Sequence, residues 1–225
     1  MQHLAMIMDG NRRWAKQNNK SVKEGHKSGI DKLNEVIIWC KNRSIKYLTF
    51  YTFSNENWNR SPSEVADLME LIENFLTEKS DELEKDNIKV RVIGRRDGRL
   101  KNSILKRINE IEAKTSKCDG MQVNIAFNYG GRQEIVDVTK KIIGMGIKEA
   151  DIDEKLFNNN LYYGDIPHPD LVVRTSGEQR ISGFLLWEIA YSEFYFLDKY
   201  WPEFDEATLD RIIEDYNKRE RRLGK

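Results

Sequence analysis

The chain has 225 residues, of which 39% are hydrophobic and 33% charged, and its 37 Lys and Arg residues balance its 37 Asp and Glu residues. This length and composition are typical of a globular α/β domain with a good core, and they exclude an intrinsically disordered chain. The balanced charge gives no general attraction to nucleic acid, so basic residues that serve a function must do so through their local placement.

The cysteine pattern and the absence of targeting segments indicate where the protein works. Only Cys40 and Cys118 occur, and they form no Cys-x-x-Cys pattern. This argues against a disulfide framework or a zinc site and fits a reducing compartment. No signal peptide is recognisable, and no apolar run approaches the roughly 20 residues needed to span a bilayer. We therefore expect a cytoplasmic protein whose contact with a membrane is peripheral, at the inner face.

The apolar pattern alternates between short runs rich in β-branched and aromatic residues and longer segments of helical period. Six runs are predicted strands: His3–Met8, Lys46–Phe53, Ile88–Ile93, Met121–Phe127, Asp170–Arg174 and Glu193–Leu197. Helices are predicted over Gly29–Asn42, over the charged segment Leu100–Lys117, and from Ser61 onward. In the last of these, Ser61 is expected as N-cap, Pro62 as the first helical residue and Glu64 as the capping-box partner.

Strands and helices that alternate in this way predict an α/β fold in a single domain, 1–225, with a mostly parallel central sheet of about six strands covered by helices. Ligands bind to such sheets at the carboxyl ends of the strands. Polar clusters directly follow four predicted strands: Met8–Ala15 (MDGNRRWA), Phe53–Arg60 (FSNENWNR), Asn128–Arg132 (NYGGR) and Arg174–Ser182 (RTSGEQRIS). We therefore expect these clusters to converge on one rim of the sheet.

Two of the clusters have the composition of anion sites. Gly10–Arg13 and Arg174–Ser182 combine arginines with glycine-containing turns, and guanidinium groups form bidentate hydrogen bonds with phosphate oxygens. Helix N-termini behind such turns add unpaired N–H groups. Two clusters indicate two phosphate-bearing substrates. Asp9 is placed to hold Mg²⁺, which takes a few carboxylate oxygens together with phosphate and water, and Glu193 is a candidate for a further oxygen ligand.

Other enzyme classes lack their motifs in this chain. There is no GxxxxGK[ST], because EGHKSG (Glu24–Gly29) resembles it only superficially, and no GxGxxG follows the first strand. No HExxH or Cys/His cluster indicates a zinc hydrolase, and no Gly-x-Ser-x-Gly elbow indicates a serine hydrolase. The DDxxD pair typical of all-helical trans-prenyl synthases is also missing.

Six blocks in a fixed order resemble the cis-prenyltransferases, and among these most closely the bacterial undecaprenyl diphosphate synthases: MDGNRRWA, the Gly25–His26 pair, FSNENWNR, NYGGR, RTSGEQRIS and LLWEIAYSEFYF. The resemblance covers essentially the whole chain. It implies an α/β fold with a hydrophobic tunnel, a homodimer and Mg²⁺ as cofactor. It further implies repeated condensation of isopentenyl diphosphate onto farnesyl diphosphate with Z geometry. The product would be undecaprenyl diphosphate, the lipid carrier precursor for cell-wall polysaccharide synthesis, released through transient contact with a membrane surface.

The resemblance also assigns roles to matching positions. Asp9 resembles the Mg²⁺-associated aspartate that assists departure of the allylic diphosphate, Asn57 the proton acceptor, and Glu193 the second metal-associated carboxylate. The remaining matches are substrate-binding positions: Gly10, Asn11, Arg12, Arg13, Trp14 and His26 on the allylic side, Ser54, Asn55, Glu56, Trp58 and Arg60 around Asn57, and Arg174, Arg180, Ile181 and Ser182 for isopentenyl diphosphate. The ending Arg222-Leu223-Gly224 resembles a terminal element that reaches the partner subunit's site.

Two roles stay open on the residues alone. An amide is a poor base, so the released diphosphate is an alternative proton acceptor to Asn57. The apolar stripe from Val65 to Leu83 is either ordinary core or the wall of the tunnel.

The chain departs from the family pattern at three positions. Arg12 stands where many members have glycine, and Gly183 replaces a common asparagine. Val22 stands where an allylic-site arginine is usual, with Lys23 as a candidate replacement.

Three alternatives to an undecaprenyl diphosphate synthase are considered. The first is a synthase that makes a shorter Z-prenyl product. The second is a noncatalytic partner subunit, against which the presence of Asp9, Asn57 and Arg60 argues. The third is a single-strand nucleic-acid binder that stacks bases on FYTF and uses NYGGR as a basic element. The zero net charge argues against this last class, so no nucleic-acid partner is expected.

Overall fold

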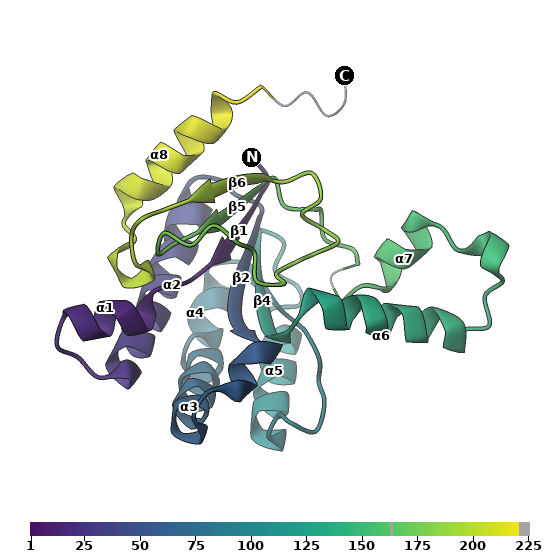
Figure 1. Ribbon diagram of the computed structural model, residues 1–225, viewed down its shortest axis with the longest axis horizontal. Helices are drawn as coiled ribbons and strands as arrows, with labels where there is room; N and C mark the ends of the chain where they lie inside the picture. The colour runs from purple at the N-terminus through teal and green to yellow at the C-terminus, as the bar shows by residue number, and fades with distance from the viewer. Residues whose placement is uncertain (163, 221–225) are drawn as a thin grey trace.

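The strands pair side by side in the order β3-β4-β2-β1-β5-β6, and every neighbouring pair is parallel (Figure 1). The computed structural model describes residues 1–162 and 164–220. The strands are β1 His3–Ile7, β2 Tyr47–Ser54, β3 Ile88–Ile93, β4 Met121–Tyr129, β5 Leu171–Arg174 and β6 Glu193–Phe196. The predicted α/β fold with six parallel strands is confirmed, and each predicted strand ends within two residues of its observed bounds.

The helices of the described residues are α1 Asn11–Gln17, α2 Val22–Asn42, α3 Pro62–Glu78, α4 Ser80–Lys85, α5 Asn102–Lys114, α6 Gly131–Gly144, α7 Glu154–Asn160 and α8 Glu206–Asn217. Three short 3₁₀ helices are η1 Asn55–Asn59, η2 Glu149–Asp151 and η3 Trp201–Glu203. The prediction that the second helix begins at Gly29 is wrong, because Ser21 and Glu24 form a capping box that starts α2 seven residues earlier. His26 therefore lies on a helix.

The sheet has a hydrophobic core on each face. In β1, Leu4 and Met6 pack into the larger cluster, whereas Ala5 and Ile7 pack into the smaller one, as the alternation of side chains along a strand requires. The larger cluster includes side chains from α2, α3, α5 and α8, and the smaller one includes α6, α7 and the segment 184–189. Figure 1 shows α6 and α7 projecting from the body of the molecule.

The parallel register brings the ends of the central strands together. Ile7 lies opposite Tyr51 on one side and opposite Arg174 on the other. The segments that leave β1, β2 and β5 therefore start at the same edge of the sheet, which is the edge where the polar clusters were expected to meet. Within the described part of the chain, no helix is both long and apolar enough to cross a membrane.

Two buried glutamates lie behind this edge, in the smaller core. The Tyr129 hydroxyl donates to Glu134 Oε2 at 2.5 Å, and the Tyr162 backbone N–H donates to Glu134 Oε1 at 2.7 Å. Glu188 is 1% exposed, and neither of its carboxyl oxygens has a hydrogen-bond partner among the described residues. Burial raises the pKa of Glu188 to about 8 and that of Glu134 to about 7, and the proximity of the two carboxyls adds to the shift of Glu188.

These raised pKa values make folding stability depend on pH. The folded chain holds protons on Glu134 and Glu188 that the unfolded chain releases near the ordinary glutamate pKa, so the free energy of unfolding should fall as pH rises from about 4.5 to about 8. We expect Glu188→Gln to flatten this fall in urea unfolding measured at several pH values. Glu149→Gln, at an exposed position, should leave the slope unchanged. A pH slope that is the same in Glu188→Gln and the parent would contradict the assignment.

Candidate functional site

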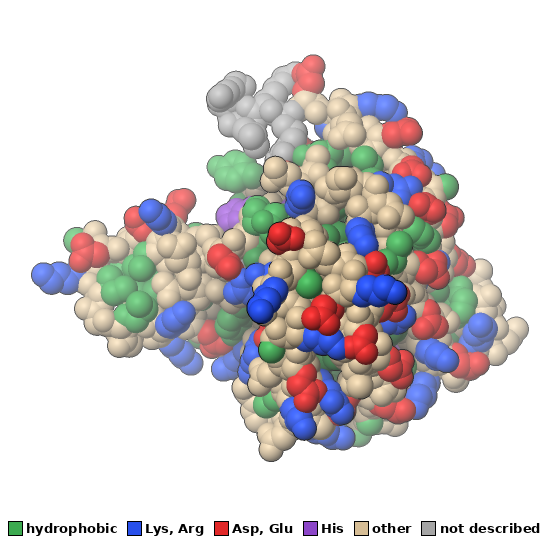
Figure 2. All heavy atoms as spheres, turned by 180° about the vertical axis from the view of Figure 1, so that it is seen from behind, with side chains coloured by type: hydrophobic (Ala, Val, Ile, Leu, Met, Phe, Trp, Pro, Cys, Tyr) green, Lys and Arg blue, Asp and Glu red, His purple; other side chains and the backbone are tan. Residues whose placement is uncertain are grey.

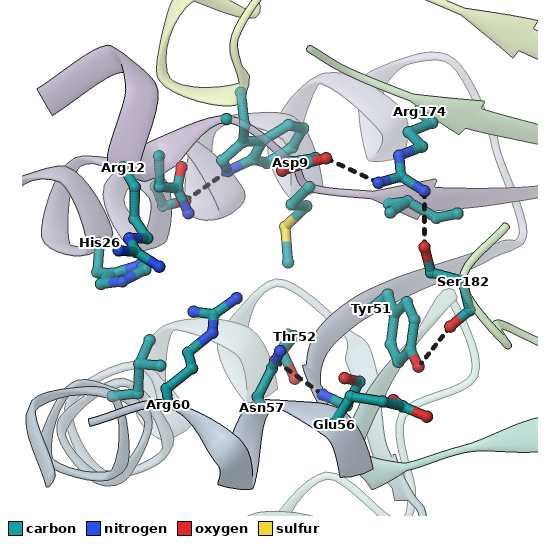
Figure 3. A pocket seen from close by; sticks show the side chains of 18 of the residues that line it. Asp9, Arg12, His26, Tyr51, Thr52, Glu56, Asn57, Arg60, Arg174 and Ser182 are labelled. Atoms are coloured by element: carbon teal, nitrogen blue, oxygen red, sulfur yellow. Dashed lines mark hydrogen bonds and ion pairs between the residues drawn. The ribbon is translucent and has the colours of Figure 1, made fainter. Parts of the chain in front are cut away.

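A cavity of about 1530 Å³ opens at the carboxyl ends of β1, β2 and β5. Its wall comes from four parts of the chain that are distant in sequence: the segment after β1 with α1, the start of α2, the β2–η1–α3 region, and the loop after β5. The turn Gly130–Arg132 after β4 completes it. The predicted convergence of the four polar clusters is therefore what the fold produces (Figure 3).

Asp9 and Arg174 form an ion pair in this cavity. Arg174 Nη2 donates to Asp9 Oδ2 at 2.8 Å, and Arg13 Nη2 lies 3.4 Å from the same oxygen. Partial burial would raise the pKa of Asp9, but hydrogen bonds from Arg174 and Ser176 outweigh it and hold the pKa below its ordinary value. Asp9 is therefore a carboxylate at neutral pH.

Arg174 connects Asp9 with the loop that follows β5. Its side chain is only 5% exposed, and Nη1 donates to Ser182 Oγ at 2.9 Å and to the carbonyl oxygen of Arg180. The Tyr51 hydroxyl donates to the Ser182 carbonyl oxygen at 3.3 Å. Figure 3 shows Asp9, Arg174 and Ser182 joined in one line along the wall. This wall holds the Ser182 hydroxyl and the guanidinium groups in a fixed relation.

A second group of basic side chains gathers around Glu64. His26 Nε2 lies 3.1 Å from Glu64 Oε1, Arg60 Nη1 donates to the same oxygen at 3.0 Å, and Arg12 Nη1 lies 3.8 Å from Oε2. Ser61 caps α3 as predicted, by accepting from the Glu64 backbone N–H. The prediction that the Glu64 side chain completes a capping box is wrong, because this side chain contacts His26 and Arg60 instead. Glu64 is a site residue that the sequence analysis missed.

Most of the predicted site residues line the cavity. These are Asp9, Gly10, Asn11, Arg12, Arg13, His26, Ser54, Asn55, Glu56, Asn57, Arg60, Arg174, Arg180, Ile181 and Ser182. The Asn57 side chain accepts the Ser54 backbone N–H at its Oδ1, at 3.0 Å, which ties η1 to the end of β2. The roles assigned to these residues stay predictions.

Two predicted tryptophans lie outside the cavity wall. Trp14 follows the cavity residues Arg12 and Arg13 on α1, where each residue turns the side chain by about 100°, and its ring lies under Lys20 Nζ at 4.8 Å from the centroid. Trp58 Nε1 donates to Asn128 Oδ1 at 2.8 Å, and the Trp58 ring packs edge-on against Phe53.

Glu193 does not join Asp9 in one metal site within this chain. It begins β6 opposite Leu171, whereas Arg174, at the cavity, lies opposite Phe196. Three residues of strand separate the two ends by about 10 Å, and Glu193 is ion-paired with Arg219 at 2.7 Å. No group of three or more acidic, histidine or cysteine side chains suited to a metal occurs in residues 1–162 and 164–220.

The departures at positions 12 and 22 have visible consequences. Val22 lines the cavity, whereas Lys23 is held by Glu70 at 2.9 Å and Asp67 at 3.3 Å on α3. Lys23 therefore does not bring a cation into the cavity in place of an arginine at position 22. Arg12 does line the cavity, with a side chain that is 59% exposed. Arg222, Leu223 and Gly224 lie outside the described residues.

Part of the cavity wall is apolar. Ile30 of α2 and Leu68 and Ile72 of α3 line it, together with Leu186 and Trp201. Phe75 and Leu76, further along the Val65–Leu83 stripe, do not line the cavity and are buried in the larger core, to which Leu68 and Ile72 also belong. The stripe is thus partly wall and partly core.

A cavity lined by several arginines and by apolar side chains suits phosphate-bearing substrates with apolar chains. Comparisons with known proteins agree. A family model described as "Putative undecaprenyl diphosphate synthase" matches residues 7–224. The isoprenyl transferase of Thermotoga maritima is 45% identical to this chain, in an alignment that covers 99% of this chain and 96% of the relative. The isoprenyl transferase of Fusobacterium nucleatum is 46% identical, with coverages of 99% and 95%.

Solved structures give the same result. A lavandulyl diphosphate synthase from Lavandula x intermedia, in complex with dimethylallyl diphosphate, superimposes with a TM-score of 0.94 at 36% identity, covering 100% of this chain and 98% of that one. A "probable undecaprenyl diphosphate synthase" from Campylobacter jejuni gives 0.83 at 33% identity, covering 100% and 99%. This chain belongs to the isoprenyl transferase family of cis-prenyltransferases, and the resemblance found in its sequence motifs is confirmed.

The contact between His26 and Glu64 gives a prediction for a measurable pKa. Burial lowers the pKa of His26, and the hydrogen bond and negative charge of Glu64 oppose this. Glu64→Gln removes the charge, so we expect the His26 titration midpoint to fall further, as followed by NMR of the imidazole protons. His168 contacts Asn158 rather than this cluster and serves as the internal control. An unchanged or raised His26 midpoint would show that Glu64 does not act on the imidazole.

Proposed function

We propose that this isoprenyl transferase is an Mg²⁺-dependent undecaprenyl diphosphate synthase, which condenses isopentenyl diphosphate repeatedly onto farnesyl diphosphate with Z geometry. The observation that carries this proposal is the Asp9–Arg174 pair in a cavity with two cationic groups and an apolar interior. The similarity to the Campylobacter jejuni protein supports the choice of product class. The product would be the lipid carrier precursor for cell-wall polysaccharide synthesis.

The two cationic groups suit the two diphosphates. We assign the allylic diphosphate to Gly10, Asn11, Arg13 and His26, with Arg12 and Arg60 at the same end of the cavity (Figure 3). Isopentenyl diphosphate is assigned to Arg174, Arg180 and Ser182. Guanidinium groups held in place before the substrate arrives stabilise charge that develops on the leaving diphosphate, without a cost of reorganisation during the reaction.

Asp9 fits Mg²⁺ as a single carboxylate ligand. Its pKa is held low, its side chain is 30% exposed to the cavity, and Mg²⁺ commonly binds one or two carboxylates plus substrate phosphates and water. When bound there, Mg²⁺ would neutralise charge on the departing diphosphate. Arg13 and Arg174 keep the Asp9 carboxylate ionised and oriented for this role.

Asn57 is better suited to positioning than to accepting a proton. Its Oδ1 already accepts the Ser54 backbone N–H, and an amide oxygen is a weak base even without such a bond. The diphosphate released from the allylic substrate carries more negative charge, and we assign the proton to it. The apolar side chains Ile30, Leu68 and Ile72 would keep water from the cationic intermediate.

A shorter product is the second candidate, and one observation favours it. Of the α3 stripe, Leu68 and Ile72 line the cavity, whereas Phe75 and Leu76, further along the helix, do not. The cavity therefore has no open path along the rest of α3 for a long chain in this conformation. The similarity to a plant lavandulyl diphosphate synthase agrees with a short product.

A homodimer with transient membrane contact is the assembly we propose. Val136 and Ile143 are 46% and 71% exposed and lie seven residues apart on the outer face of α6, so they form one apolar stripe. Figure 2 shows hydrophobic side chains on the projecting arm that contains this helix. Tyr191, just before the edge strand β6, and Phe196, the last residue of that strand, are also exposed. Such apolar surface is typical of an interface.

Product analysis tests the reaction. Purified protein is incubated with farnesyl diphosphate, labelled isopentenyl diphosphate and Mg²⁺, with and without a chelator, and we expect a chelator-sensitive undecaprenyl product. Asp9→Ala should lower turnover about a hundredfold or more, because the leaving charge loses its metal ligand, while the melting curve stays cooperative. Asp31→Ala, at an exposed position of α2, is the control. Activity that persists in Asp9→Ala would overturn the mechanism, a shorter product would select the second candidate, and no incorporation would indicate a partner subunit.

Light scattering tests the assembly. We expect the parent to have the mass of a dimer and Ile143→Glu to shift it toward monomer, because a charge in an apolar interface is costly. Ala113→Glu, on the exposed face of α5, should leave the mass unchanged. A parent that is monomeric at micromolar concentration would contradict the homodimer.

A further inference from the structure

A second, smaller cavity lies next to the catalytic one. It has a volume of about 350 Å³, at the small end of the range for ligand pockets. It lies between the η1–α3 junction and the segment that leads into α5, and its lining residues are Trp58, Arg60, Pro62, Val65, Ala66, Met69, Arg99 and Lys101. Of these residues, only Arg60 also lines the catalytic cavity.

The lining consists of five apolar and three cationic residues. The apolar residues, which we name the floor, are Trp58, Pro62, Val65, Ala66 and Met69, and the cations, which we name the rim, are Arg60, Arg99 and Lys101. Arg99 Cζ stands 5.7 Å from the centre of the Trp58 ring, so one guanidinium group lies at the boundary between the two parts. None of the eight lining residues is acidic. An apolar floor with a rim of three cations is complementary to a molecule with a short apolar chain and an anionic head.

The rim cations are not equally compensated. Arg60 is paired with Glu64 at 3.0 Å, and Arg99 with Asp97 at 3.0 Å. Lys101 has no ion-pair or hydrogen-bond partner among the described residues for its side chain, although it stands at the start of α5, where cations are disfavoured by the helix dipole. Lys101 therefore supplies uncompensated positive charge to the lining of the cavity.

We propose that this cavity is a second binding site for a prenyl diphosphate of one or two isoprene units, outside the catalytic cavity. The apolar chain lies on the floor against Trp58 and Met69, and the diphosphate is held by Arg99 and Lys101. The volume limits the chain to a short one, and the rim selects a diphosphate because it offers several donors in a small space.

Arg60 couples the new site to the catalytic one, since it lines both cavities. A diphosphate in the second cavity attracts the Arg60 guanidinium and competes with Glu64 for it. Because Glu64 also holds His26 and Arg12, occupancy of the second cavity changes the arrangement of cations around the allylic diphosphate. Binding at the two sites is then linked, and the linkage is reciprocal.

Calorimetry with geranyl diphosphate and a chelator, which prevents turnover, tests the site by counting molecules. We expect two bound molecules per chain for the parent protein. We expect one for Ala66→Trp, because the indole ring introduced at this exposed position of α3 would fill the cavity. Lys101→Glu should weaken the second event about tenfold or more, because a charge-assisted contact becomes a repulsion. Lys106→Glu makes the same charge change on α5 away from the cavity and should keep two events of parent affinity.

Ligand analogues define the chemistry of the second event. Inorganic diphosphate alone and geraniol alone should each fail to reproduce it, because each lacks one half of the recognition, and decanoate should bind more weakly than geranyl diphosphate. A single event in the parent protein, or two unchanged events in Ala66→Trp, would overturn the proposal. So would an event that Lys101→Glu and Lys106→Glu weaken equally. The product assay on the parent protein reports separately on the proposed reaction, because it does not depend on the number of geranyl diphosphate molecules bound.

Discussion

A buried guanidinium group must be matched by a carboxylate, and the pair of Arg174 and Asp9 meets this requirement at the centre of the cavity. An arginine side chain stays protonated inside proteins, so burying it without a partner costs several kcal/mol. The Arg174 group reaches Asp9 on one side and the Arg180–Ser182 loop on the other. The segments after β1 and β5 are therefore held in one relation, and the polar wall of the site follows from it.

The backbone around Asp9 is arranged to keep this pair in place. Its N–H donates to Thr175 Oγ1 at 2.9 Å, and its carbonyl oxygen accepts the Trp201 N–H at 3.0 Å. The next residue, Gly10, has φ +108°, and a Cβ there would lie 2.7 Å from the Tyr200 ring. Only glycine fits this conformation and this close approach. Three segments thus fix the carboxylate before any substrate binds, which is the condition for electrostatic preorganisation.

Elementary rules were enough to predict the frame of this molecule but not every side chain in the site. The runs of β-branched residues located the strands, and the rule that parallel strands end at one edge predicted that the clusters at Asp9, Asn57 and Arg174 would meet. Glu64 was not predicted as a site residue because its position three residues after Ser61 is also a capping position. Only the packing of α2 on α3 brings His26 next to it. For Glu193, the same strand rule argued against the resemblance: a residue that begins a strand lies at the edge opposite the site.

Two acidic side chains, Asp9 and Glu64, lie among the arginines of the site, and each has an electrostatic role there. Asp9 and Glu64 each hold guanidinium groups in position, and this orients the donors while no substrate is bound. Glu64 lies between the guanidinium groups of Arg12 and Arg60, so the cations around it outnumber it and still attract a diphosphate. Asp9 is likewise outnumbered by Arg13 and Arg174, but the part of its carboxylate that is exposed to the cavity would repel a diphosphate placed directly beside it, since like charges in a low-dielectric cavity interact strongly. A carboxylate at that point favours the complex only if a cation lies between it and the phosphate oxygens, and this is the physical reason to expect that the reaction depends on a divalent metal.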